Sequence, residues 1–130
     1  MPTNNIEIVK KIDETFKNND IDGFLSYCAD DVKWWIVGEK TVTGKDAIKE
    51  FMRSNTGSVP EFKTVRLFGD GDFVHSEGEM QMKDDGGKEV PYRYCDTYQF
   101  RDGKVVELVS YLISTAKESE TSGTAAGKGA

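Results

Sequence analysis

Residues 92–114 contain two long strand-forming runs joined by Arg101-Asp102-Gly103, and this pattern limits the possible folds more than any other stretch of the chain. Both runs are rich in aromatic and β-branched residues, which are typical of pleated strands. Asp-Gly between such runs is a strong hairpin signal, because glycine takes the positive φ that a tight turn needs. We therefore expect this hairpin at the centre of a curved antiparallel sheet, whose inward face carries the function.

The rest of the chain predicts helices with one strand among them, followed by further strands. Apolar residues recur at helical spacing before Asn18, after Asp20 and after Gly44; Thr3 or Asn4 can cap the first of these helices, and Asp20 can cap the second. Strand patterns are expected at 32–37, 62–68, 72–82, 89–100 and 104–114. This order indicates an α+β fold, in which a strongly curved sheet packs on N-terminal helices and encloses a conical cavity.

Length and charge limit the classes of function. A chain of 130 residues is expected to form one domain, which we place at residues 1–115. The small polar residues of 116–130 predict a flexible tail. The net charge of −6, from 17 basic and 23 acidic residues, argues against a nucleic-acid partner, because that partner requires a clustered positive face.

Neither a secretory signal nor a membrane span is expected. The N-terminus lacks a basic region followed by an apolar stretch, and no apolar run reaches the length of a span. Cys28 and Cys95 are too few for a disulfide framework, and neither has a ligand neighbour at metal spacing. We therefore expect reduced thiols, no metal, no cofactor and a cytoplasmic location.

Asp96 is the first candidate catalytic residue. Alternation along its strand places Tyr92, Tyr94, Asp96, Tyr98 and Phe100 on one face. A carboxyl held among aromatic rings has a raised pKa and can donate a hydrogen bond to a ligand oxygen. The alternative is that Asp96 faces solvent or accepts a hydrogen bond from a neighbouring hydroxyl.

The register of the last hairpin determines what faces Asp96. A three-residue loop with a bulge at Gly103 predicts the pairs Asp96 with Leu108, Tyr94 with Ser110 and Tyr92 with Leu112. Of two adjacent indoles, one packs inward and the other outward, and we expect Trp34 to shape the cavity with Tyr94 and Tyr98. Such a lining suits a small, mostly apolar ligand that carries a carbonyl or hydroxyl.

His75 is the second candidate catalytic residue, because it is the one histidine and can act as a base near neutral pH. If Lys83 pairs with Lys88, His75 lies opposite Asp96 and a His–Asp dyad can form, but Glu77 and Glu79 then point inward. A slip of one residue exchanges the two faces and leaves these three side chains outside. Burial favours the slipped register.

Three stretches resemble the SnoaL-like group of the nuclear transport factor 2-like superfamily, which includes ketosteroid isomerases. They are NNDIDGFLSYCADDVKWW, VTGKDAIKEFM and YRYCDTYQFRDGKVVELVSYL, and the resemblance covers roughly residues 6–115. It implies a cone-shaped α+β barrel with an internal pocket, and a homodimer. Members include isomerases, dehydratases, cyclases, epoxide hydrolases and non-catalytic binding domains, so the resemblance implies a fold more than a reaction.

The catalytic positions of these relatives are only partly filled. By this resemblance Asp96 matches the second oxyanion donor of ketosteroid isomerases, whereas Ile36 stands where their general base lies and Ile12 where their tyrosine donor lies. The acid that many relatives carry after the final-strand tyrosine is also missing, since Leu112 and Ile113 follow that tyrosine. Isoleucine cannot carry a proton between carbons, so steroid isomerisation is not the leading expectation.

Two functions stay open on the sequence. The first is a pocket protein with acid–base activity of the isomerase, cyclase or hydrolase type on a small apolar molecule, in which Asp96 polarises an oxygen and His75 is the extra base. The second is a non-catalytic ligand-binding or dimerisation domain with the same cavity.

Overall fold

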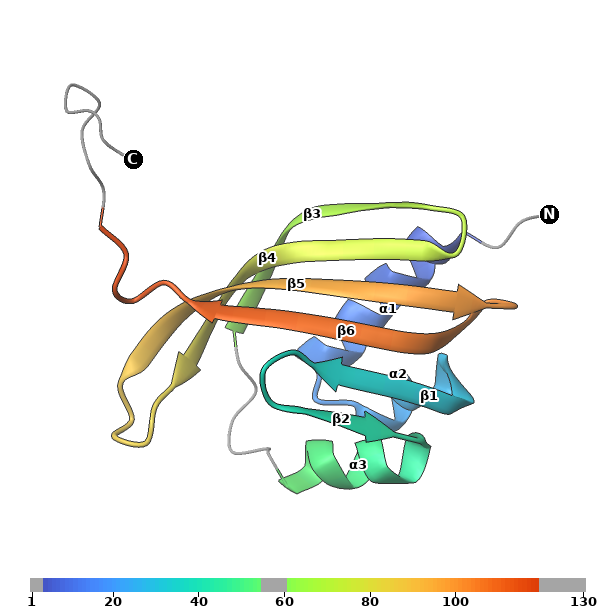
Figure 1. Cartoon of the computed structure of the whole chain (residues 1–130), viewed down its shortest axis with the longest axis horizontal. Helices are drawn as coiled ribbons and strands as arrows, with labels where there is room; N and C mark the ends of the chain where they lie inside the picture. The colour runs from blue at the N-terminus through green and yellow to red at the C-terminus, as the bar shows by residue number, and fades with distance from the viewer. Residues whose placement is uncertain (1–3, 55–60, 120–130) are drawn as a thin grey trace.

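The computed structural model describes residues 4–54 and 61–119. Its elements are α1 (Asn5–Lys17), α2 (Ile21–Ser26), β1 (Cys28–Ile36), β2 (Lys40–Thr43), α3 (Lys45–Ser54), β3 (Glu61–Asp70), β4 (Phe73–Lys83), β5 (Glu89–Arg101) and β6 (Lys104–Ser114) (Figure 1). Every element predicted from the sequence is present. The short strand β2 was not predicted, because four residues give too little alternation to recognise.

The six strands form one curved sheet in the order β2-β1-β6-β5-β4-β3. Strands β3 to β6 form the expected antiparallel meander, and the β5–β6 hairpin lies at the centre of the sheet. Strand β1 pairs parallel with β6, so one pairing of the expected antiparallel sheet is parallel. The helices lie against one side of the sheet (Figure 1), which confirms the α+β class, and β2 and β3 leave the sheet with two open edges.

The two expected helix caps are present. The Asn4 side chain accepts a hydrogen bond from the Glu7 backbone N–H at 3.3 Å, and Asp20 accepts one from the Gly23 N–H at 2.9 Å. Each carboxamide or carboxylate satisfies a donor that the first turn of a helix leaves unpaired. The turn between α1 and α2 is thereby fixed, with Asn19 at a φ of 54°.

The hydrophobic core fills one end of the space between the sheet and the helices. Tyr98, Phe100 and Leu108 from the central hairpin join Val9 and Ile12 of α1 in one cluster, and none of the five is more than 2% exposed. Farther along the same strands, most inward side chains other than Tyr94 are only partly buried. The interior is therefore solid at one end and open at the other.

The β5–β6 turn contains two residues rather than three. Asp102 and Gly103 have φ values of 53° and 79°, and Arg101 pairs with Lys104, as in a type I′ turn. The bulge lies between Gln99 and the next residue instead of at Gly103.

This change moves the cross-strand partners by two positions. Asp96 pairs with Ser110, Tyr94 with Leu112 and Tyr98 with Leu108, so the predicted pairs were wrong. A shift of two residues keeps each side chain on its face, because side chains alternate with a period of two. The inward stripe therefore survives the correction.

The β4–β5 register is the slipped one. Lys83 pairs with Glu89, Ser76 with Asp96 and His75 with Thr97. The alternative register would have turned glutamates into the interior, at a large cost in desolvation.

Two further observations concern the domain boundaries and membranes. The expected tail at 116–130 lies outside the described residues from 120 onward. Among the helices that the structure describes, none is long and apolar enough to cross a bilayer.

Candidate functional site

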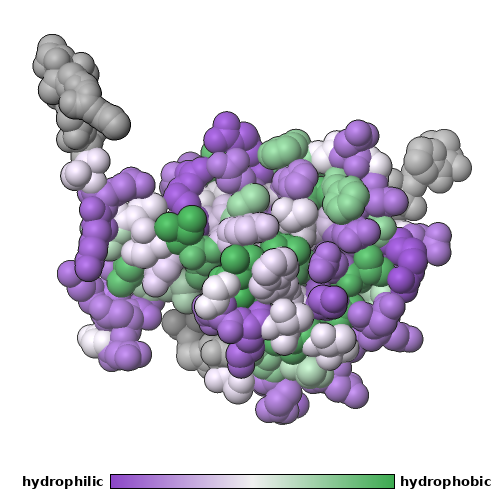
Figure 2. All heavy atoms as spheres, viewed as in Figure 1, coloured by the Kyte–Doolittle hydropathy of each residue, from purple (hydrophilic) through white to green (hydrophobic). Residues whose placement is uncertain are grey.

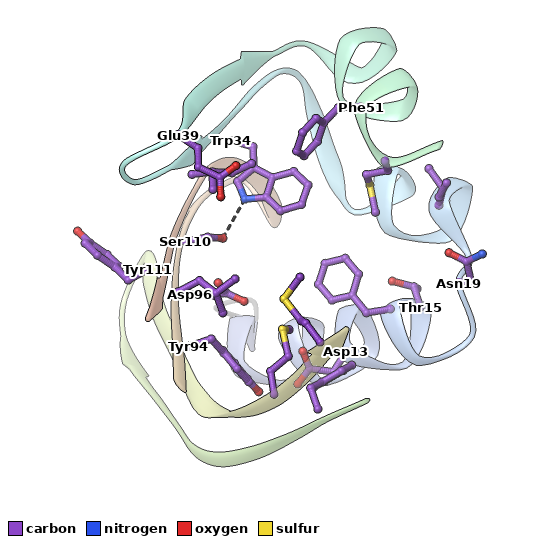
Figure 3. Close-up of a pocket in the computed structure, with 18 of the residues that line it drawn as sticks. Asp13, Thr15, Asn19, Trp34, Glu39, Phe51, Tyr94, Asp96, Ser110 and Tyr111 are labelled. Atoms are coloured by element: carbon purple, nitrogen blue, oxygen red, sulfur yellow. Dashed lines mark hydrogen bonds between the residues drawn. The ribbon is translucent and has the colours of Figure 1, made fainter. Parts of the chain in front are cut away.

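A cavity of about 390 Å³ opens between the sheet and the helices, beyond the solid end of the core. Its size falls within the range of small-molecule sites. Most of its wall is apolar, with residues from α1, β1, α3, β4 and β6: Phe16, Trp34, Ile36, Phe51, Met80 and Leu112. Figure 3 shows the labelled side chains of Asp13, Trp34, Tyr94 and Asp96 around a common space.

Asp96 lies on the wall of this cavity, at the middle of β5. Burial raises the pKa of its carboxyl from 3.8 to about 7, hydrogen bonding with Ser110 opposes the rise, and repulsion from Asp13 adds to it. Asp96 is therefore part protonated near neutral pH, so it can donate a hydrogen bond or a proton as well as accept one.

Ser110 connects Asp96 to Trp34. The indole Nε1–H of Trp34 donates to Ser110 Oγ at 2.8 Å, drawn as a dashed line in Figure 3. Because Oγ accepts this bond, the Ser110 proton is available to the Asp96 carboxyl on the facing strand. The three side chains thus form a row of polar groups on an otherwise apolar wall.

Asp13 is a second carboxyl on the cavity wall, contributed by α1. Thr64 Oγ1 donates to Asp13 Oδ2 at 3.2 Å and lies 3.0 Å from the Tyr94 hydroxyl. Burial raises the pKa of Asp13 from 3.8 to about 6, while the Thr64 bond and the charge of Lys17 oppose the rise. Two carboxyls with raised pKa values therefore face one cavity.

Sequence reasoning placed Asp13 on the polar side of the first helix and missed it. A signal was present, because Asp13 stands four residues after Val9 and next to Ile12, within the apolar stripe that ends at Phe16. A charged residue inside such a stripe is directed at the interior, and it is costly there unless it has a partner or a function.

The other predicted ligand-binding residues divide into two groups. Trp34, Tyr94, Ser110 and Leu112 line the cavity, whereas Tyr92, Tyr98 and Leu108 are not among its lining residues. Tyr98 and Leu108 are 0% and 1% exposed and belong to the solid core, so placing them in the cavity was wrong. The physical reason is their position: they lie toward the Gly103 turn, where helix side chains fill the interior.

His75 faces away from the cavity. Its Nδ1 lies 3.1 Å from the Thr97 hydroxyl, and its ring packs on Phe68 with centroids 5.1 Å apart. Neighbouring Glu77, on the same outer face, pairs with Arg66 and Arg93. The structure therefore does not form the His75–Asp96 dyad, because the slipped register separates the two side chains onto opposite faces.

Metal ligation has no candidate in the parts of the chain that the structure describes, since no group of three or more His, Cys, Asp or Glu side chains converges there. Both cysteines are free thiols, and Cys28 is buried.

Solved structures with the same fold are numerous. One is an NTF2-like protein of unknown function from Burkholderia pseudomallei, with 20% identity, a TM-score of 0.78, and coverage of 83% of this chain and 89% of that one. A second is TerC, co-crystallised with polyporic acid, with 24% identity, a TM-score of 0.73, and coverage of 83% and 90%. A third is an LEH-like epoxide hydrolase from M. tuberculosis, with 23% identity, a TM-score of 0.72, and coverage of 83% and 81%.

These likenesses show the fold, since all three identities are low. Comparison with curated proteins gave no match. The family model described as "SnoaL-like domain" matches residues 9–108, which is most of the chain. The stretches that suggested this family, the six-stranded curved sheet and the family match agree, and the chain belongs to the SnoaL-like domain family.

Proposed function

We propose that this protein binds a small, mostly apolar molecule in the cavity and places a polar oxygen of that molecule against Asp96. The observation that carries the proposal is a carboxyl of raised pKa on the wall of an apolar cavity of about 390 Å³. A group that is part protonated near neutral pH can hydrogen-bond a carbonyl or exchange a proton with a hydroxyl. Two fold relatives, an LEH-like epoxide hydrolase and a protein crystallised with polyporic acid, are compatible with a small-molecule site.

Acid–base catalysis requires a second group that removes a proton from the substrate or from an attacking water while Asp96 donates one to the substrate oxygen. Ile36 lines the cavity at the position where the resemblance puts the base of ketosteroid isomerases, and it cannot do this. His75 is on the outer face. Asp13 faces the cavity from the opposite layer and can fill the role, so we propose isomerase-, cyclase- or hydrolase-type chemistry through these two carboxyls.

A non-catalytic binding domain is the second candidate function. The apolar side chain of Ile36 in place of a base favours it. Both candidate functions require ligand binding, and only the first requires turnover of the ligand.

The test begins with native mass spectrometry of the purified protein, followed by a binding screen of cyclic ketones and alcohols. Trp34 fluorescence in a Trp35→Phe background reports on the cavity, because Trp34 is on its wall and Trp35 is outside. Asp96→Leu, which keeps the size of the side chain and removes both donor and acceptor, should lower the affinity of an oxygen-bearing ligand about three- to tenfold, the usual net effect of losing one neutral hydrogen bond.

The control in this screen is His75→Ala, a change on the outer face of the sheet that should leave the affinity unaltered. Equal binding to wild type and Asp96→Leu would remove Asp96 from the site. Turnover in wild type that is lost in Asp96→Asn and Asp13→Asn would favour catalysis, and binding without turnover would favour the second candidate.

A homodimer is also proposed, through the outer face of β1 and β6. Trp35, Tyr111 and Ile113 are 45%, 44% and 68% exposed there, and Figure 2 shows hydrophobic residues among polar ones on the molecular face that it views. Sedimentation should give a dimer that Ile113→Lys dissociates and Val65→Lys, at an exposed position on edge strand β3, does not. A wild-type monomer would refute this proposal. The cytoplasmic location stays a prediction.

A further inference from the structure

The charged groups that line the cavity all have the same sign. They are Asp13, Asp20, Glu39 and Asp96, and no Lys, Arg or His is among the lining residues in the described chain. Asp20 is exposed and its Oδ1 caps α2, and Glu39 is exposed at a turn. Asp13 and Asp96 are thus the two partly buried carboxyls of the wall. Asp13 comes from α1 in the helical layer, and Asp96 comes from β5 in the sheet.

The protein compensates the charge of Asp13 only weakly. Within the described chain, Thr64 is its one hydrogen-bond partner, through Oδ2. Two charged groups of α1 act on the Asp13 carboxyl: Glu14 raises its pKa, and Lys17 lowers it. Lys17 is exposed, lies 3.9 Å from a Glu14 oxygen and is outside the cavity wall. A carboxylate that is buried without a close cation retains a strong attraction for one.

Of the two carboxyls, Asp13 is the one that ionises at the lower pH. Its pKa is about 6, against about 7 for Asp96. The Thr64 hydroxyl donates a hydrogen bond to Asp13, and this bond also favours the ionised form of the Asp13 carboxyl. Asp96 can keep a proton for a ligand oxygen while Asp13 presents a negative charge to the same ligand.

Aromatic rings surround this charge. Phe62 and Tyr94 line the cavity beside Asp13 and meet edge to face with centroids 6.2 Å apart. The Phe62 ring already attracts a cation, since Lys17 Nζ lies 5.7 Å from its centroid. Ring faces and a carboxylate together suit an ammonium group attached to an apolar body.

We propose that Asp13 is the acceptor of a protonated amine, so that the cavity selects small apolar amines over neutral molecules of the same shape. This inference rests on the proposed function of the cavity as a ligand site. It adds a substrate class to that function and assigns Asp13 as the residue that determines it.

The experiment compares isosteric pairs that differ only in the polar group: 2-phenylethylamine with 2-phenylethanol, and 1-aminoadamantane with 1-adamantanol. Each is titrated by Trp34 fluorescence in the Trp35→Phe background at pH 8 and pH 5. At pH 8 each amine should bind about tenfold or more tightly than its alcohol, as expected for a charge-assisted hydrogen bond. At pH 5 the amines stay protonated but Asp13 does too, so the advantage should fall below about threefold.

Asp13→Asn, titrated at pH 6.5 where Asp96 keeps most of its proton, should remove the advantage of the amine and leave the alcohol affinity unchanged, which also shows that the variant is folded. Glu14→Gln is the matched control, because it removes an exposed charge from the next position of α1 and should keep the advantage. If the alcohols bind as tightly as the amines, or if the advantage of the amines survives in Asp13→Asn, the inference about amines fails. The proposed function of the cavity as a ligand site would still stand. If no member of either pair binds, the inference and the proposed function fall together.

Discussion

Replacing Asp96 by asparagine should make this protein more stable at alkaline pH and leave it nearly unchanged at acid pH. The substitution keeps the shape of the side chain and removes its ability to ionise. Most substitutions of partly buried residues destabilise, so a gain would mark Asp96 as a position that is not optimised for stability.

The size of the effect follows from the raised pKa. The carboxyl titrates at about 7 in the folded state and at 3.8 in the reference state, so the folded state binds more protons between these values. The free energy of unfolding therefore has its full value below pH 3.8 and falls as pH rises to about 7. At about 1.4 kcal/mol per unit of pKa, the loss above pH 7 is about 4 kcal/mol, and Asp96→Asn avoids it.

Urea denaturation of wild type and variant at pH 4 and pH 8 measures this difference directly. The variant should exceed wild type by up to about 4 kcal/mol at pH 8 and by little at pH 4. Asp85→Asn, in the exposed β4–β5 turn, is the control for loss of a carboxylate, and it should leave the free energy of unfolding unchanged at both pH values. A variant that is less stable than wild type at pH 8, or a difference that does not depend on pH, would refute the argument.

Two further substitutions test the packing and the electrostatics of the site. Gly78→Ala should lower the free energy of unfolding by about 2 kcal/mol, because its Cβ would collide with the Lys63 carbonyl oxygen and lie 2.6 Å from the Tyr94 hydroxyl. At Gly86 the Cβ would make only an ordinary contact of 3.5 Å with Asp84 Oδ1, so Gly86→Ala should be near neutral in denaturant titrations. Ser110→Ala removes the group that opposes the rise in the Asp96 pKa, so the carboxyl should titrate about one pH unit higher by NMR; a lower midpoint would contradict the assigned role.

The fold could be predicted from the sequence because its signals are local. Alternating aromatic and β-branched residues define β5 and β6, Asp102-Gly103 defines their turn, and Asn4 and Asp20 mark two helix starts. Burial cost also selected the correct face for His75 among two registers. The parallel pairing of β1 with β6 has no local signal, since it joins segments about 75 residues apart.

The site was harder to predict, because it depends on where the interior stops being filled. Alternation places Tyr98, Asp96 and Tyr94 on one face equally, yet Tyr98 is in the core and the other two face the cavity. That boundary is set by which helix side chains meet the sheet, a long-range property. Asp13 was missed for a different reason: its place within the apolar stripe of α1 is a local signal, but the residue was grouped with the polar side of that helix.

The most direct test of the account is the titration of the Asp96 carboxyl carbon by NMR in the ligand-free protein. The Asp96→Asn variant assigns the signal by its disappearance. A midpoint of about 7 is expected, because burial on the wall of the apolar cavity disfavours the charged form. A midpoint near 4 would mean that Asp96 is solvated like a surface carboxylate, and the proposed site would lose its central group.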